Sequence, residues 1–132
     1  MFDHVELPVD DPDKSARFYE RALAPLGIPR SPPGAYEEFG ALTLVRRTPK
    51  QRLHLAFIAP SRAAVDAFHA AGLKAGGKDN GRPGVRPFAP DYYAAYLRDL
   101  DGHNIEAVHR SDATRAGWSW LGMGLPEGDP VT

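Results

Sequence analysis

Cysteine is absent from this chain of 132 residues, which excludes disulfide bonds, a thiolate nucleophile and any metal site built on cysteine. No apolar run approaches the roughly 18–20 residues that a membrane span needs. An excess of one charge is also lacking, because 16 Lys and Arg stand against 17 Asp and Glu. We therefore expect no nucleic-acid partner and no membrane partner. The first residues show no secretory signal, and we expect a cytoplasmic protein.

Proline, by contrast, is abundant, at 13 residues, which is about twice the usual share of roughly 5%. Most prolines stand where turns are expected, for example in segments 32–34 and 82–84. They are interpreted as punctuation between ordered elements, not as a low-complexity tract. The chain length suits one compact domain.

An internal repeat at an offset of 50 residues organises the chain. Without a gap, the offset aligns His4 with His54, Leu7 with Phe57, Phe18 with Phe68, Leu23 with Leu73, and Gly27 with Gly77. Each copy opens with a short extended segment, residues 4–9 or 54–58. Apolar and polar residues alternate in the first of these segments, which predicts a strand with one face on a core.

A helix is predicted after each opening strand. Asp11 and Ser61 are the N-cap candidates, and Gly27 and Gly76–Gly77 provide the stops. Each helix has a stripe of mostly apolar residues at helical spacing. The stripes comprise Ser15, Phe18, Tyr19, Ala22, Leu23 and Leu26 in the first helix, and Val65, Phe68, His69, Gly72 and Leu73 in the second.

Further extended segments complete each half of the repeat. The Asp101–Gly102 pair between apolar runs predicts a hairpin. Aligning the closing strands of the two halves places Thr43 on Glu106. We predict an α+β fold of two tandem βαβββ modules, about residues 1–50 and 51–110. The modules should pack together, because a half of this size buries little core alone.

The repeat ends near residue 110. Residues 1–110 are therefore predicted to form one domain, and residues 111–132 a C-terminal tail. The tail has no clear period, yet it holds both tryptophans of the chain. A fully solvated tail rarely keeps two tryptophans, so we expect this segment to dock on the domain.

Two histidines at equivalent positions of a repeat become neighbours if a pseudo-twofold axis pairs the opening strands. Glu106 on a closing strand would then complete a site with His4 and His54. Two imidazoles and a carboxylate form a facial triad that leaves open positions on a divalent ion. The alternative is that repetition alone keeps both histidines without a metal. The remaining histidines are assigned to a helix face, a turn and a strand end: His69, His103 and His109.

Other residues are candidates for lining a pocket. Tyr92, Tyr93 and Tyr96 lie on the strand before that of Glu106, so one face of this strand could face a ligand. Aromatic packing on a sheet explains them equally well. Arg86 could bind an anionic substrate group in a bidentate manner, or be an ordinary exposed arginine.

The sequence of residues 1–110 resembles the vicinal oxygen chelate superfamily. This group includes glyoxalases, bleomycin-resistance proteins, fosfomycin-resistance transferases and extradiol dioxygenases. The similar segments are Asp3–Val9, Ser15–Tyr19, Leu26–Gly27, His54–Phe57, Tyr92–Tyr96 and Asp99–Val108. The resemblance implies a curved mixed sheet around a central pocket, one divalent metal ion, and a homodimer.

Carried over by position, the family's metal ligands match His4, His54 and Glu106. Resemblance to glyoxalase I would require a carboxylate where Thr43 stands, so this residue is placed at the pocket without being a ligand. Three ligands are more similar to the pattern of the fosfomycin-resistance or dioxygenase members. Iron, manganese, zinc and nickel are not distinguished.

Three functions follow as hypotheses. The first is a metal-dependent enzyme, a lyase, transferase or dioxygenase, that acts on a small oxygenated molecule through a 2-His-1-Glu site. The second is a metal-free protein that binds a drug-like molecule, as bleomycin-resistance proteins do. The third is an interaction protein with a vestigial pocket. The combination of His4, His54 and Glu106 favours the first.

Overall fold

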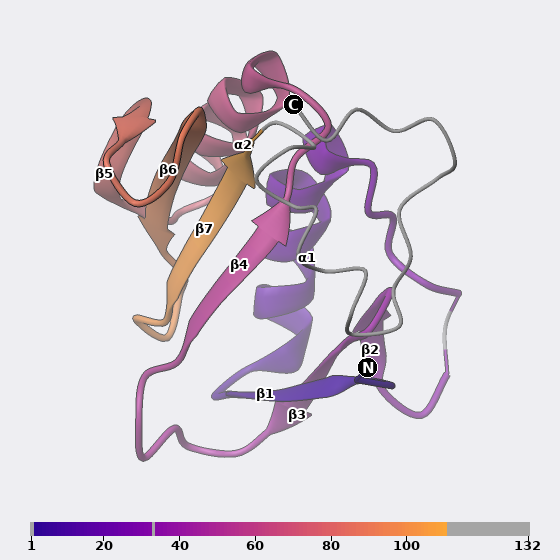
Figure 1. Cartoon of the computed structure of the whole chain (residues 1–132). Coiled ribbons are helices and arrows are strands. Elements are labelled where there is room, and N and C mark those ends of the chain that lie inside the picture. The colour runs from indigo at the N-terminus through magenta and orange to yellow at the C-terminus, as the bar shows by residue number, and fades with distance from the viewer. Residues whose placement is uncertain (1, 33, 111–132) are drawn as a thin grey trace.

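The computed structural model describes residues 2–32 and 34–110. Figure 1 shows two small sheets with two helices, and the elements follow in the order β1 Val5–Val9, α1 Pro12–Leu23, the 3₁₀ turn η1 Ala24–Leu26, β2 Glu37–Phe39, β3 Leu42–Arg46, β4 His54–Ile58, α2 Arg62–Lys74, β5 Lys78–Arg86, β6 Tyr92–Arg98 and β7 Asn104–His109. The α+β class is therefore confirmed. The expected docking of the tail, residues 111–132, lies outside the described residues.

The two sheets share one pattern of strand pairing. The first has the order β1-β3-β2 and the second the order β4-β7-β6-β5. In each sheet the opening strand runs parallel to the closing strand. Glu6 pairs with Thr43 in the first sheet, and Ala56 pairs with Glu106 in the second. Thr43 and Glu106 thus occupy corresponding positions, as the alignment of the closing strands predicts.

The first sheet has three strands in the described residues, whereas the βαβββ pattern requires four. The missing strand would fall between η1 and β2, in the described residues of segment 27–36, which form no strand. Ser31 donates one backbone hydrogen bond to the carbonyl of Glu38, at 2.8 Å. Pro29 and Pro32 have no N–H to donate, so a regular ladder cannot form along this segment.

The prediction of a turn at residues 82–84 is wrong. These residues belong to β5, the edge strand of the second sheet, which pairs antiparallel with β6. The pairing shifts register between Asp79 and Gly81 and again between Gly81 and Gly84. An edge strand with bulges tolerates Pro83, because the ladder does not need every N–H there.

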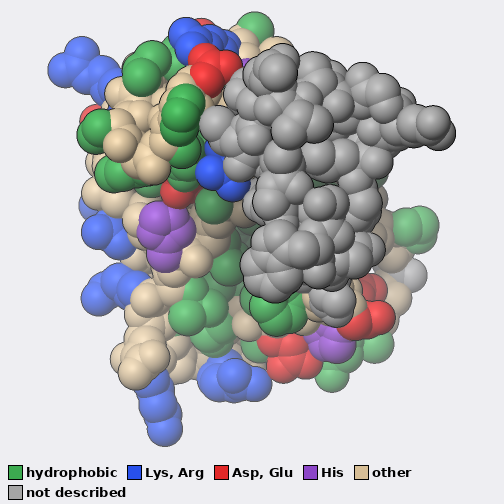
Figure 2. All heavy atoms as spheres, in the orientation of Figure 1, with side chains coloured by type: hydrophobic (Ala, Val, Ile, Leu, Met, Phe, Trp, Pro, Cys, Tyr) green, Lys and Arg blue, Asp and Glu red, His purple; other side chains and the backbone are tan. Residues whose placement is uncertain are grey.

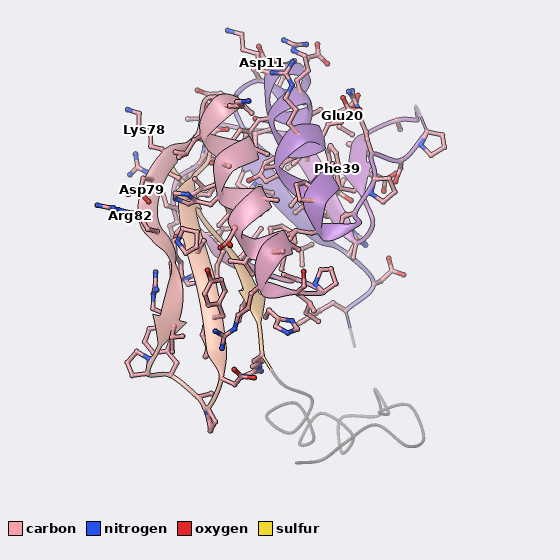
Figure 3. The ribbon with its side chains drawn as sticks, turned by 90° about the horizontal axis from the view of Figure 1, so that it is seen from above. Asp11, Glu20, Phe39, Lys78, Asp79 and Arg82 are labelled. Carbon is pink, nitrogen blue, oxygen red and sulfur yellow. The ribbon has the colours of Figure 1, made fainter. Side chains whose placement is uncertain are left out.

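The helices cover one face of each sheet and pack against each other. Contacts join α1 to β2 and β3, and α2 to β5, β6 and β7; Figure 3 shows the two helices side by side. Asp11 and Ser61 accept backbone N–H bonds as N-caps, as predicted. The expected stripe of α1 is buried, whereas Leu73 of α2 is exposed. None of the helices in the described segments has the length and apolar character to cross a membrane.

Two residues show how tightly the second half is packed. Gly72 of α2 lies against β6 so closely that an added Cβ would stand 2.2 Å from Leu97 Cδ1. His103, just before β7, is fully buried. Its Nδ1 accepts the Leu53 N–H at 2.9 Å, and its Nε2 donates to the Pro8 carbonyl at 2.8 Å. His103 therefore connects β1 to the start of β4.

Candidate functional site

A cavity of about 650 Å³ lies on the second sheet, on the face opposite α2. Its lining residues come from β4, β5, β6, β7 and the β5–β6 loop, and they are His54, Ala56, Asn80, Phe88, Tyr92, Tyr96, Asn104 and Glu106. On each strand that contributes two, these residues are an even number of positions apart, so they share one face of the sheet. Residues at the alternate positions of these strands, Ile105 and Ala107 among them, pack in the core beneath.

A hydrogen-bonded group of His54, Glu106 and Tyr92 forms the polar wall of this cavity. His54 Nε2 lies 2.7 Å from Glu106 Oε1, and the Tyr92 hydroxyl donates to Glu106 Oε2. Glu106 is 2% exposed, whereas the His54 side chain is half exposed. Both carboxylate oxygens are thus held in place, while the imidazole faces the cavity.

The neighbouring tyrosines remain neutral donors over a wide pH range. Burial, followed by the hydrogen bond to Glu106, raises the pKa of Tyr92 well above its usual value. Burial and the charge of Glu106 also raise the pKa of Tyr96. A tyrosine held in this way can donate a proton in a hydrogen bond, but does not ionise near neutral pH.

Two asparagines extend the network behind His54. Asn104 Nδ2 lies 3.1 Å from His54 Nδ1, and Asn80 Nδ2 donates to Asn104 Oδ1 at 2.9 Å. With the amides assigned in this orientation, Nδ1 is an acceptor and the ring proton is on Nε2, where it points to Glu106. Without a metal ion, the asparagines therefore favour this tautomer. A metal ion on Nε2 would require the ring proton on Nδ1 and an Asn104 amide turned so that its Oδ1 accepts it.

The first sheet carries a second polar face at the corresponding positions. His4 lies just before β1 and Glu6 lies within it, two positions further on and therefore on the same face. His4 Nε2 is 3.8 Å from Glu6 Oε2. Thr43 of β3 donates to Glu38 Oε2 of β2, at 3.4 Å. The hydrogen bond that the His4 ring donates to the Asp3 carboxylate is the main cause that raises the pKa of His4. This face has a threonine where the second sheet has Glu106.

The three predicted metal ligands are not all brought together in one chain. His54 and Glu106 are in contact, but His4 lies on the other sheet. Within segments 2–32 and 34–110, no three histidine, aspartate or glutamate side chains gather as a metal site would require. Figure 2 shows histidine side chains in separate places on one face of the molecule. Thr43 lies on the first sheet, as His4 does, and does not line the cavity.

The predicted pocket residues divide in the same way. Tyr92 and Tyr96 line the cavity, whereas Tyr93 points to the helix face, where its hydroxyl donates to Asp66 at 2.6 Å. The guanidinium of Arg86 stacks over the Tyr96 ring, 5.4 Å from its centroid, and also donates to a backbone carbonyl of its own strand. Arg86 thus supports an aromatic wall and does not itself line the cavity.

Sequence reasoning missed Asn80, Asn104 and Phe88. Asn104 stands two positions before Glu106, so strand alternation would have placed it on the same face. Asn80 gives no such signal, because it lies in a bulged strand. Phe88 lies in a loop and is 67% exposed, and its ring meets that of Tyr92 edge-on at 5.4 Å.

Known proteins similar to this chain point to one family. The family model described as "Glyoxalase/Bleomycin resistance protein/Dioxygenase superfamily" matches residues 1–107. A glyoxalase/bleomycin resistance protein from Albidiferax ferrireducens T118 is 37% identical, with a TM-score of 0.69, over 83% of this chain and 98% of that one.

More distant structures share the fold. A lactoylglutathione lyase from Agrobacterium tumefaciens is 19% identical, with a TM-score of 0.60, over 83% of this chain and 92% of its own. The oxidase ChaP-H1 is 21% identical, with a TM-score of 0.63, over 85% and 97%. No curated protein matches. The family match over most of the chain shows that this protein belongs to the glyoxalase/bleomycin resistance protein/dioxygenase superfamily.

Proposed function

We propose that the protein is a metal-dependent enzyme that acts on a small oxygenated molecule, as a homodimer with two shared sites. In each site, His54 and Glu106 of one chain would hold a divalent ion together with His4 of the second chain. The observation that carries this proposal is the contact of His54 with Glu106 on a cavity wall. A buried carboxylate beside an imidazole is a donor set that divalent iron, manganese, zinc or nickel accepts.

The third ligand is assigned to a second copy because of where His4 lies. It corresponds to His54 in the repeat, its side chain is half exposed, and it belongs to the other sheet. A twofold axis that faces the first sheet of one chain with the second sheet of its partner would bring both histidines to one ion. Such an interface is self-complementary, so it makes two equal sites. The central pocket and curved sheet of the family would then arise between chains.

The side chains of this cavity suit a substrate with vicinal oxygens. A bound divalent ion supplies polarisation of substrate oxygens and stabilises a developing oxyanion. Tyr92 holds one oxygen of Glu106 and leaves the other beside His54. Phe88 and Tyr96 provide aromatic walls for the apolar part of such a substrate. The volume of about 650 Å³ lies within the usual range for small-molecule sites, roughly 300–1,000 Å³.

Complementation between two inactive variants tests the shared site. His4→Ala and His54→Ala homodimers should each lose stoichiometric metal. When the two are unfolded and refolded together, about a quarter of the wild-type metal should return, because random pairing leaves about half of the chains in mixed dimers with one intact site of two. Elemental analysis measures the metal, and light scattering should give about twice the 14.4 kDa chain mass.

Three results would contradict the proposal. A monomer in light scattering removes the shared site. If both variants are folded and no metal returns in the mixture, His4, His54 and Glu106 do not bind one ion together. Loss of metal in the control His69→Ala, whose ring pairs with Asp79 away from the cavity, would show that the loss is not specific to the site.

A metal-free binding protein is the second candidate function. It is favoured by the His54–Glu106–Tyr92 group, which is fully hydrogen-bonded without an ion, and by the aromatic walls of the cavity. Protein purified without chelators distinguishes the two candidates. Stoichiometric metal supports the enzyme, and its absence, together with unchanged ligand binding in His54→Ala, supports the binding protein.

A further inference from the structure

A second cleft, of about 520 Å³, lies at the turn between β6 and β7. We call it the basic cleft, and its lining residues are Arg52, Lys78, Arg98, Asp99, Leu100, Asp101 and Gly102. It shares no residue with the cavity of His54 and Glu106. Figure 3 shows Lys78 at the start of β5, at the edge of the molecule.

Three cationic side chains converge on this cleft, and among residues 2–32 and 34–110 none of them has an acidic partner in an ion pair. Lys78 and Arg98 are direct cross-strand partners of β5 and β6, so their side chains share a face. Arg98 Nη1 donates to the Gly102 carbonyl at 3.2 Å. Arg52 packs over the same glycine, where its Nε would stand 2.5 Å from an added Cβ. Like charges placed opposite each other destabilise a sheet, so this arrangement has a cost that a bound anion would offset.

The two aspartates of the cleft are already occupied by other donors. Asp99 accepts the Tyr19 hydroxyl on one oxygen, and backbone N–H groups, at 2.8 Å and 3.0 Å, on the other. Asp101 accepts the Asp10 N–H at 2.9 Å and the Ser15 hydroxyl at 3.3 Å. Within the described segments, neither forms an ion pair with a cation of the cleft. The carboxylates therefore hold the turn in place and leave the cations facing the open volume.

We propose that the basic cleft binds the phosphate group of a small phosphorylated molecule. Two guanidinium groups and an ammonium group provide the planar and point donors that a dianionic phosphate accepts on several oxygens. A carboxylate carries one charge and two oxygens, and it would leave part of this donor set unused. The remaining volume accommodates the organic part of the ligand. This site is independent of the metal site proposed above.

Titration with pyrophosphate, phosphate and malonate tests the basic cleft. Binding is followed by calorimetry and by amide NMR of the full chain. Pyrophosphate should saturate one site per chain, with shifts at Gly102 and Arg98, and should raise the melting temperature. Arg52→Gln and Lys78→Gln should each weaken binding about tenfold. Arg17→Gln, which removes an exposed charge from α1, should leave the affinity within about twofold.

Stability without ligand provides an independent readout. Lys78→Gln should melt at or above the wild-type temperature in buffer without anions, because it relieves the repulsion of Arg98, and should lose most of the stabilisation by pyrophosphate. A lower melting temperature in plain buffer would show that Lys78 is structural. Equal weakening by Arg17→Gln, shifts centred on His54 and Glu106, or tighter binding of malonate than of phosphate would each overturn the proposal.

Discussion

Replacing His103 by alanine should destabilise the fold more than any other histidine substitution. The ring is fully buried, and it bonds both the Leu53 N–H and the Pro8 carbonyl. Alanine leaves these two backbone groups without their partner. A buried group that loses its hydrogen bond costs about 1–3 kcal/mol. Leu53 is partly exposed, so we take the lower half of that range and expect a total loss of about 2–4 kcal/mol.

Urea denaturation, followed by circular dichroism in metal-free buffer, measures this loss. With a slope of about 2 kcal/mol per molar urea, the midpoint should fall by about 1–2 M while the slope is unchanged. His4→Ala is the control, because an exposed side chain should change stability by less than about 0.5 kcal/mol. If His103→Ala unfolds within that same margin of the wild type, the role assigned to His103 is refuted.

Three further predictions concern the site and a helix end. Asn104→Leu should weaken divalent-metal binding about 10–100-fold in calorimetry, because it removes the side-chain amide that, once turned, would accept the Nδ1–H of a metal-bound His54; unchanged affinity would contradict this. Tyr92 should remain protonated above pH 10, where exposed tyrosines ionise, and Glu106→Gln should lower the pKa of Tyr92, as read by tyrosinate absorbance. Because the folded-state pKa is raised, the contribution of Tyr92 to stability is complete below the pKa of the unfolded state. It is lost as the pH rises from there through the pKa of the folded state. Ser61→Ala should cost about 1 kcal/mol in urea denaturation by removing the N-cap of α2.

The sequence predicts those features of the fold that depend on local patterns. Asp11 and Ser61 cap their helices because short polar side chains before an apolar stripe have few other roles. The alignment of Thr43 with Glu106 succeeds because strand alternation fixes which side chains share a face. The bulged β5 could not be predicted, since Pro83 and Gly84 indicate a turn unless the neighbouring strand is known.

From the sequence, only those contacts of the candidate site that join two strands of one sheet could be predicted. His54 and Glu106 meet because they lie on adjacent strands, whose pairing follows from the repeat. The position of His4 depends on how the two sheets are oriented, which no local pattern encodes. His103 was assigned to a turn, correctly by position, but its burial depends on Pro8, 95 residues earlier in the chain.

The close approach of α2 to β6 makes the cavity sensitive to changes on the opposite side of the sheet. Gly72 leaves no room for a methyl group beside Leu97, and the residue before Leu97 in β6, Tyr96, lines the cavity. A larger side chain at position 72 would displace the buried Leu97 side chain, and any shift of β6 that makes room for it would move Tyr96 as well. Ligand selectivity can therefore be altered through a helix position that no ligand touches.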